Sequence, residues 1–432
     1  MHTYHEHHSM SSQTAWHVTR ILLTVAFVLA LVLWFAQSAH GQTYTILHNF
    51  TNGPDGSFPV ATLTVDAAGN LYGTTCGSSC TGSGNSAGTV FELLKSGSGW
   101  TFTTLYEFQG GVDGSVPGSP VIFGRDGGLY GTTQWGGRGT GTVFRLTPPP
   151  NALGNWRKSM LYSFYGADGY SPWGDLVFDG AGNLYGTTIQ GGDSLAGNVF
   201  RLRPSSGGWQ EDVLYMFTGG DDGAYPYSGV VMDAYGNLYG TASQGGSGYG
   251  TVFEVTSQGE QTLYTFQGGS NGAYPYGGVL LQGGNVIVTT TMQGAGGGGT
   301  AMMINNSCCF YSFSGTSDYW NGPWSTLTGS SNFTHVIVYG TTYGDGRYLL
   351  GSVFTMLPDG CAPPWGWSYA SLWDFWNAQE SGANPVGGVV FGPDGNMYGT
   401  TSQGGAYGYG VVFELSWDSN EAYDASVCSP TQ

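Results

Sequence analysis

The chain has 432 residues, of which 77 are glycine, and its formal net charge is −18. The glycine content excludes a helical bundle, because an interior glycine costs about 1 kcal/mol in a helix. A hydrophobic content of 40 % excludes a disordered chain, so a large, turn-rich β protein remains. The few basic residues beyond Arg20 are scattered, so we expect neither nucleic acid nor an anionic membrane surface as a partner.

The first 41 residues have the features of a secretory signal peptide. Arg20 precedes an apolar run over residues 21–35, and the small residues Ala39 and Gly41 follow. A charged flank, an apolar core and an A-x-G-like site are typical of an exported protein. Cleavage after Gly41 would leave Gln42 first; cleavage after Ala39 and an uncleaved signal anchor are the alternatives. We therefore expect a protein that is secreted, periplasmic or held at the cell surface.

One phrase, G-N-L-Y-G-T-T, recurs along the rest of the chain. Seven perfect or degenerate copies lie at residues 69–75, 127–133, 182–188, 236–242, 284–290, 336–342 and 395–401. Their spacing gives a period of roughly 54 residues. Most copies are accompanied by an apolar run such as G-V-V-M-D, by V-F-E-L and by L-Y-x-F, or by variants of them. Each phrase is β-branched or aromatic and bounded by Gly, Asp or Asn, which is typical of strands and turns.

Four short strands per repeat, in seven repeats, predict an all-β fold. We expect a seven-bladed β-propeller with four-stranded blades over residues 42–416. The mature chain opens with an L-Y-x-F-like strand at residues 43–50, and the last repeat ends at its V-F-E-L strand. The N-terminal strand should therefore complete the last blade and close the ring. The glycine after the central Tyr, Gly240 for example, is expected to lie tightly against a neighbouring side chain.

Six cysteines fit an oxidising compartment. Disulfide bridges are expected at two places, between Cys76 and Cys80 within one loop and between Cys361 and Cys428 after equivalent strands of successive repeats. The second bridge would tether the C-terminal tail, residues 417–432. The adjacent Cys308 and Cys309 form either a vicinal disulfide or two buried thiols.

The ordered phrases G-N-L-Y-G-T-T, Q-G-G, G-T-V-F-E-L and L-Y-x-F resemble the GloVer tandem repeat. This is the Gloeobacter/Verrucomicrobia repeat of the choice-of-anchor tandem repeat proteins. The resemblance covers nearly all of the mature chain and weakens over residues 283–356. It implies a bacterial exported or surface protein with no established activity, and it supplies no catalytic residues.

The reactive side chains argue against metal, cofactor or nucleophile chemistry. Beyond the leader only His48 and His335 remain, apart from His40 near the cleavage site, and there is no phosphate-binding loop. We therefore expect no cofactor, no metal ion and no catalytic histidine.

Carboxylates are the remaining candidates for catalysis. One set alternates with Arg at a single repeat position, which indicates a solvated strand face: Glu92, Glu254 and Glu414. A second set lies in D-x-x-G turns: Asp66, Asp179, Asp233 and Asp394. A third set precedes Gly in the loops between repeats: Asp55, Asp113, Asp168 and Asp222. For this third set, turn formation is one interpretation and oxygen ligation of Ca²⁺ is the other.

The strongest indication of binding is aromatic. In a propeller, the loops between blades share one face with the Q-G-G loops, and aromatic rings beside amide groups suit sugars. The candidate residues are Tyr170, Trp173, Tyr225, Tyr227, Tyr274, Tyr276, Trp320 and Trp324, with Gln190, Gln244 and Gln403. The alternative is that these rings wedge between blades beside their prolines.

We therefore expect an exported, non-catalytic, monomeric propeller that binds a glycan or another surface polymer through this face. One alternative is a carbohydrate-active hydrolase or lyase that uses Asp or Glu on the same face. The other is a structural platform for protein interactions.

Overall fold

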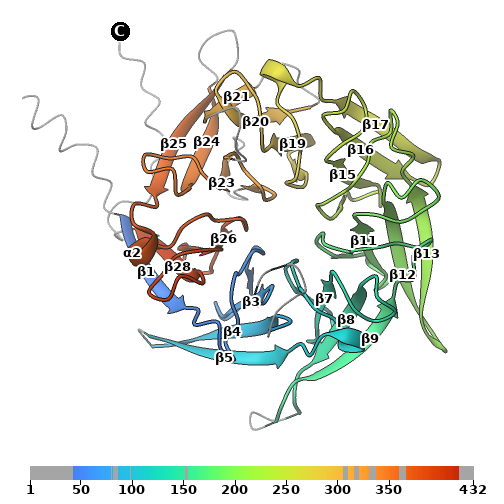
Figure 1. Cartoon of the computed structure of the whole chain (residues 1–432), viewed down its shortest axis with the longest axis horizontal. Helices are drawn as coiled ribbons and strands as arrows, with labels where there is room; N and C mark the ends of the chain where they lie inside the picture. Colours follow the sequence, from blue (N-terminus) through green and yellow to red (C-terminus); the bar gives the residue numbers. More distant parts are fainter. Residues whose placement is uncertain are drawn as a thin grey trace, which may run out of the picture. The chain divides into compact units, whose positions relative to one another are not determined.

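The computed structural model describes residues 42–78, 80, 86–97, 99–150, 154–304, 310–315, 321–329, 337–359 and 366–417. These residues form seven four-stranded blades in a ring (Figure 1), which confirms the predicted seven-bladed propeller. The compact unit that holds the blades spans Tyr44–Leu415. The expected signal segment, nearly all of the tail, and Trp320, His335, Cys308, Cys309, Cys361 and Cys428 lie outside the described residues.

Each blade begins with a short inner strand and ends with an outer strand. The first three blades are β2 (Thr64–Val65), β3 (Leu71–Thr75), β4 (Thr89–Ser96) and β5 (Gly99–Glu107); β6 (Ile122–Phe123), β7 (Leu129–Thr133), β8 (Thr142–Thr147) and β9 (Arg157–Ser163); and β10 (Val177–Phe178), β11 (Leu184–Thr188), β12 (Asn198–Ser205) and β13 (Gly208–Met216). The fourth and fifth are β14 (Val231–Met232), β15 (Leu238–Ala242), β16 (Thr251–Thr256) and β17 (Gly259–Thr265); and β18 (Leu280–Gln282), β19 (Asn285–Thr290), β20 (Gly297–Met303) and β21 (Phe310–Ser314). The last two are β22 (Thr328–Gly329), β23 (Val338–Thr342), β24 (Ser352–Asp359) and β25 (Gly366–Asp374); and β26 (Val390–Phe391), β27 (Met397–Thr401), β28 (Val411–Trp417) and β1 (Gln42–Asn49).

Pairing within the blades is antiparallel, and one parallel bridge between Phe310 and Gly366 joins the outer strands of the fifth and sixth blades. Short helical turns are few in the described ranges: η1 (Gly111–Asp113), η2 (Gly269–Asn271) and α2 (Ala378–Ser381). No helix of this part of the chain is long and apolar enough to cross a membrane.

The ring closes through its N-terminal strand, as predicted. Strand β1 lies outermost in the seventh blade, in the order β1-β28-β27-β26. Tyr44 of β1 stacks on Trp373 of the sixth blade with ring centroids 4.6 Å apart. The Phe50 amide, just after β1, donates to the Gly410 carbonyl at 3.1 Å. The first strand therefore belongs to the last blade and also packs against the blade before it.

The glycine of each Y-G-T-T phrase makes room for a phenylalanine on the next strand. A Cβ on Gly240 would stand 2.4 Å from Cζ of Phe253, and one on Gly399 would stand 2.5 Å from Cζ of Phe413. Both distances are shorter than any real carbon contact, so the end of the phenylalanine ring occupies the space that a side chain at the glycine would need. The expected close packing at this position is confirmed.

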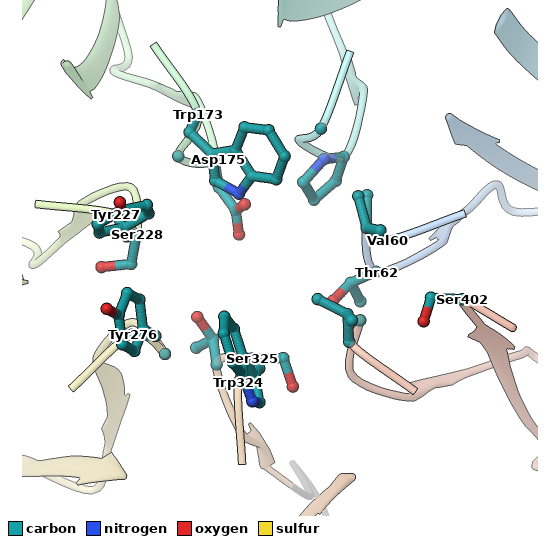
Figure 2. A pocket seen from close by; sticks show the side chains of 18 of the residues that line it. Val60, Thr62, Trp173, Asp175, Tyr227, Ser228, Tyr276, Trp324, Ser325 and Ser402 are labelled. Carbon is teal, nitrogen blue, oxygen red and sulfur yellow. The ribbon is translucent and has the colours of Figure 1, made fainter. Parts of the chain in front are cut away.

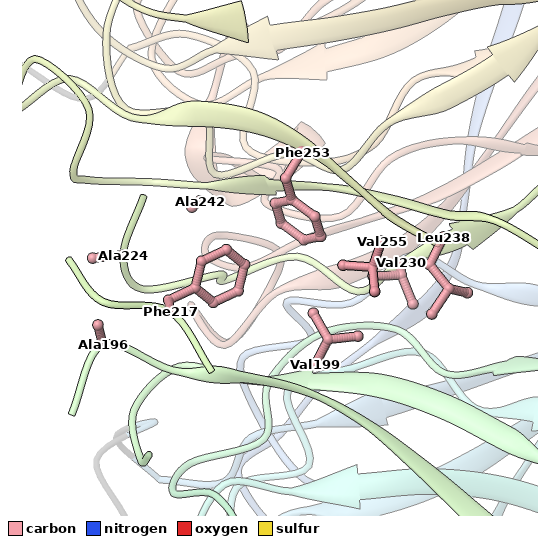
Figure 3. Close-up of a cluster of buried hydrophobic side chains, with 9 residues drawn as sticks. All are labelled: Ala196, Val199, Phe217, Ala224, Val230, Leu238, Ala242, Phe253 and Val255. Carbon is pink, nitrogen blue, oxygen red and sulfur yellow. The ribbon is translucent and has the colours of Figure 1, made fainter. Parts of the chain in front are cut away.

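The same phenylalanines form the contact between blades (Figure 3). Phe217, which follows β13, meets Phe253 of the next blade edge-on with centroids 4.9 Å apart. Val199, Val230 and Leu238 complete this buried cluster. Equivalent edge-on pairs join other neighbouring blades, for example Phe108 with Phe144. Edge-to-face pairs add about 0.5–1.5 kcal/mol each beyond the area they bury.

The two threonines of the phrase have separate roles. The first bonds to the next blade: Thr241 Oγ1 donates to the Gly277 carbonyl at 2.9 Å. Thr400 does the same across the closure, to the Ala61 carbonyl at 3.2 Å. The second pairs within its blade, as Thr75 does with Thr89 at 2.8 Å. Since all of these hydroxyls are buried, losing one partner would leave the other unsatisfied.

Candidate functional site

The loops that enter each blade and the loops between its second and third strands lie on one face. Isolated backbone bridges tie them together, at Tyr170 with Gln190, Ala224 with Gln244 and Ala383 with Gln403. The exposed Gln side chains therefore belong to the same face as the interblade loops, as the sequence suggested.

A proline in each interblade loop locks the chain onto the preceding blade. Pro172 Cδ lies 2.4 Å from where a Cβ on Gly141 would stand, and Pro226 has the same relation to Gly197 at 2.6 Å. Both glycines have φ near 100°, a conformation that only glycine adopts easily. The proline of the next interblade loop therefore packs directly against the glycine of G-T-V-F-E-L.

The residue before the proline is held in a left-handed conformation. Tyr225 has φ 55°, and its N–H donates to Ala196 of the preceding blade while its carbonyl accepts from Ser243 of its own blade. Left-handed backbone at a non-glycine residue costs about 1–3 kcal/mol, and two hydrogen bonds hold it in place. The residue after the proline is thereby aimed toward the ring axis.

Residues from all seven blades converge on a cavity of about 580 Å³ at the centre of this face (Figure 2). The position after the proline contributes one residue per blade: Val60, Gly118, Trp173, Tyr227, Tyr276, Trp324 and Val386. The third to sixth blades therefore supply aromatic side chains, and the other three supply small or aliphatic ones. At this position, therefore, the aromatic residues come from four consecutive blades, and Phe58 of the first blade adds a further ring to the lining.

Four of the aromatic side chains in the lining, Tyr227, Tyr276, Trp324 and Tyr343, contact one another in sequence and form an aromatic wall. Tyr227 meets Tyr276 with centroids 4.8 Å apart, and Tyr276 stacks on Trp324 at 4.9 Å. Tyr343, from the loop after β23, follows Trp324 at 5.8 Å. Trp173 covers Gly118, where a Cβ would stand 2.7 Å from its ring. Burial raises the pKa of Tyr227, Tyr276 and Tyr343, so their hydroxyls stay neutral.

Polar groups stand between and opposite these rings. Ser402 Oγ donates to the Asn384 carbonyl at 2.6 Å, and Ser228 Oγ pairs with Thr241 at 3.0 Å. Ser325 lines the cavity with 9 % of its surface exposed, and its Oγ has no hydrogen-bond partner among the described residues. That oxygen is itself shielded from solvent, so it presents no free group to the cavity.

Asp175 is the one acidic residue among the described residues that line the cavity. Figure 2 shows its carboxylate directed into the space between the lining side chains. No Lys or Arg of the described chain lines this space. Burial raises the pKa of Asp175 to about 6.

The aromatic residues predicted from the sequence fall into two groups. Trp173, Tyr227, Tyr276 and Trp324 line the cavity, together with the exposed Gln403. The others lie outside its lining: Tyr170, Tyr225, Tyr274, Gln190 and Gln244. Tyr225 packs against the interblade cluster of Phe217, and Tyr170 meets Trp135 edge-on at 5.5 Å. The rings of Tyr170 and Tyr225 therefore pack between blades, whereas the four rings after the prolines face the ring axis.

Sequence reasoning missed Asp175, Ser325 and Tyr343. Aligning the residues after each proline would have identified Asp175, because the same position in the other blades carries Thr, Pro or Gly. Tyr343 directly follows the strand of its repeat, where the other blades carry Cys, Gln, Ile, Ser or Thr, so no periodic signal marked an aromatic residue there.

The remaining acidic and histidine candidates have structural partners. The carboxylates of the loops between repeats accept backbone N–H groups, as Asp222 does from Thr218 at 2.6 Å, so turn formation describes them. Glu254 accepts from the Tyr239 hydroxyl at 2.8 Å. His48 pairs with Asp55 at 3.1 Å and stacks on a phenylalanine. In the part of the chain that the structure describes, no three His, Cys, Asp or Glu residues gather as metal ligands would.

The predicted loop disulfide is present. Cys76 and Cys80 are bonded, with Cα atoms 4.9 Å apart, and Cys80 lines the cavity. The bridge therefore fixes the edge of the site that the first blade contributes.

Comparison with known proteins agrees with this architecture. The model of the Gloeobacter/Verrucomicrobia repeat matches residues 33–154, 88–302 and 247–425, which together span most of the chain. No curated protein matches the sequence.

Solved structures share the fold at low sequence identity. The extracellular domain of a candidate one component system of B. thetaiotaomicron, BT4673, has a TM-score of 0.51 at 13 % identity over 87 % of this chain. This chain covers 41 % of that protein's chain. A protein of unknown function from Dyadobacter fermentans gives a TM-score of 0.41 at 11 % identity, over 88 % of this chain and 100 % of its own. A candidate 6-phosphogluconolactonase from Bacteroides uniformis gives 0.46 at 11 %, over 76 % and 86 %.

Proposed function

Since the chain belongs to the Gloeobacter/Verrucomicrobia repeat family, whose repeats here build one closed ring, we propose that it is an exported, non-catalytic binding module for a glycan. One observation carries the proposal: six aromatic side chains and several hydroxyls converge on a single cavity of about 580 Å³ at the ring axis. Apolar sugar faces pack on aromatic rings while sugar hydroxyls bond to side-chain oxygens.

The geometry favours binding over hydrolysis. Glycosidases of the common type use two carboxylates about 5–10 Å apart. Asp175 is the one carboxylate among the described lining residues, so the pair needed for that mechanism is not assembled there. The leader expected at residues 1–41 supports export, and the extracellular origin of one similar propeller is consistent with it.

A glycan array tests the proposal. We expect the wild type to be retained on at least one oligosaccharide and Tyr276→Ala with Trp324→Ala to lose that retention without a lower melting temperature. Tyr235→Ala is the matched control, because Tyr235 is 92 % exposed and lies in the turn between β14 and β15, away from the cavity lining. Equal retention of the double variant, or no retention of the wild type on any glycan, would contradict the proposal.

A further inference from the structure

Asp175 is an unusual residue for its position. It stands three residues after the proline of its loop, where the other blades carry neutral residues: Thr62, Pro120, Gly229, Gly278, Thr326 and Gly388. Six of the seven equivalent loops therefore form without a charged residue at this position. A carboxylate at this position is not a requirement of the propeller.

The carboxylate also lacks a partner among the described residues. In the described part of the chain, no ion pair and no hydrogen bond reaches it, and the lining contains no basic side chain. The aspartates of the D-x-x-G turns, by contrast, are bonded, as Asp179 is by the Asn183 amide at 2.6 Å and by two backbone N–H groups. An acid that is buried without a counter-charge is costly unless a ligand supplies one.

The surroundings of Asp175 match the requirements of an ammonium group. Trp173 is two residues before it, and Tyr227 and Tyr276 continue the wall beyond. Cations are attracted to the faces of Trp and Tyr, and a carboxylate adds a charge-assisted hydrogen bond. The net charge of −18 would further raise the local concentration of a cationic ligand.

We propose that the cavity recognises an amino sugar through its protonated amine, which pairs with Asp175 while the ring packs on the aromatic wall. The inference rests on the proposed glycan binding and specifies its ligand class.

Calorimetric titration of the full chain with two glucosamine tetramers tests the inference, one fully deacetylated and one fully N-acetylated. At pH 6.5 the wild type should bind the deacetylated tetramer at least tenfold more tightly. Asp175→Asn should abolish that preference and keep the affinity for the N-acetylated tetramer. Asp221→Asn is the matched control, because it removes one charge from an exposed loop outside the cavity lining and should preserve the preference.

The outcomes separate the two proposals. Equal binding of both tetramers by the wild type, or a preference that survives in Asp175→Asn, would overturn the amino-sugar inference and leave glycan binding intact. Binding of neither tetramer would overturn the inference, and the glycan array would then decide the broader proposal by itself.

Discussion

Replacing Asp175 by Asn should stabilise the folded protein above pH 6 and leave its stability almost unchanged below pH 4. The reason is desolvation: the carboxylate is half-buried in the cavity lining with no partner among the described residues, so the charged form is disfavoured relative to the unfolded chain. Burial raises the pKa of Asp175 from 3.8 to about 6. Asn has the same shape and carries no charge at any pH.

The sign and size follow from proton linkage. Well below pH 3.8 both states hold the proton, so Asp175 costs nothing. The cost grows between pH 3.8 and about 6, where only the folded state keeps the proton, and it is constant at higher pH. A shift of this size is worth about 3 kcal/mol, at 1.36 kcal/mol per unit. With an unfolding entropy of about 2.1 cal/mol/K per residue, a unit of this length would gain about 4 °C in melting temperature.

Thermal unfolding of wild type and Asp175→Asn at pH 4 and pH 8 measures this difference. Asp179→Asn should behave in the opposite way. Burial alone would raise the pKa of Asp179, but hydrogen bonds from Asn183 and Tyr185 lower it, so its charge stabilises the fold at pH 8 and the gain disappears in acid. If Asp175→Asn were no more stable than wild type at pH 8, the carboxylate would have a partner or be solvated, and the reasoning above would be wrong.

Three further predictions concern the ring. Gly240→Ala should cost about 1–3 kcal/mol of stability through its contact with Phe253, and adding Phe253→Leu should recover part of it in a double-mutant cycle. Tyr225→Ala should lower stability by on the order of 2 kcal/mol and keep ligand affinity, whereas Tyr227→Ala should weaken affinity about tenfold at unchanged stability; a reversed pattern would contradict the assigned orientations. Deleting residues 43–50 should lower the melting temperature of the whole unit, and an unchanged calorimetric transition would show that β1 does not hold the ring closed.

The periodic features of the fold could be predicted because each phrase has one structural role repeated in every blade. Gly240 and its equivalents were expected to be closely packed, and each lies under a phenylalanine. Ring closure by the first strand followed from the order of the phrases. Structural features that all blades share recur at the same place in every repeat, so the sequence pattern predicts them.

The site could not be predicted to the same depth, because it depends on where the blades differ. In the phrase Y-P-Y the sequence does not distinguish Tyr225 from Tyr227. The left-handed backbone before the proline turns the first ring between blades and the second toward the axis. Asp175 was overlooked for the opposite reason, since a single departure from the repeat carries no periodic signal.

The pairing of β1 with β28 has a consequence for the order of folding. These strands come from opposite ends of the described chain, so their contact has the largest sequence separation in the molecule, and such contacts form late. Blades built from consecutive strands can form earlier, but the cavity takes residues from all of them. The proposed ligand affinity would therefore be a property of the finished ring, and a binding measurement would report whether refolding has reached its last step.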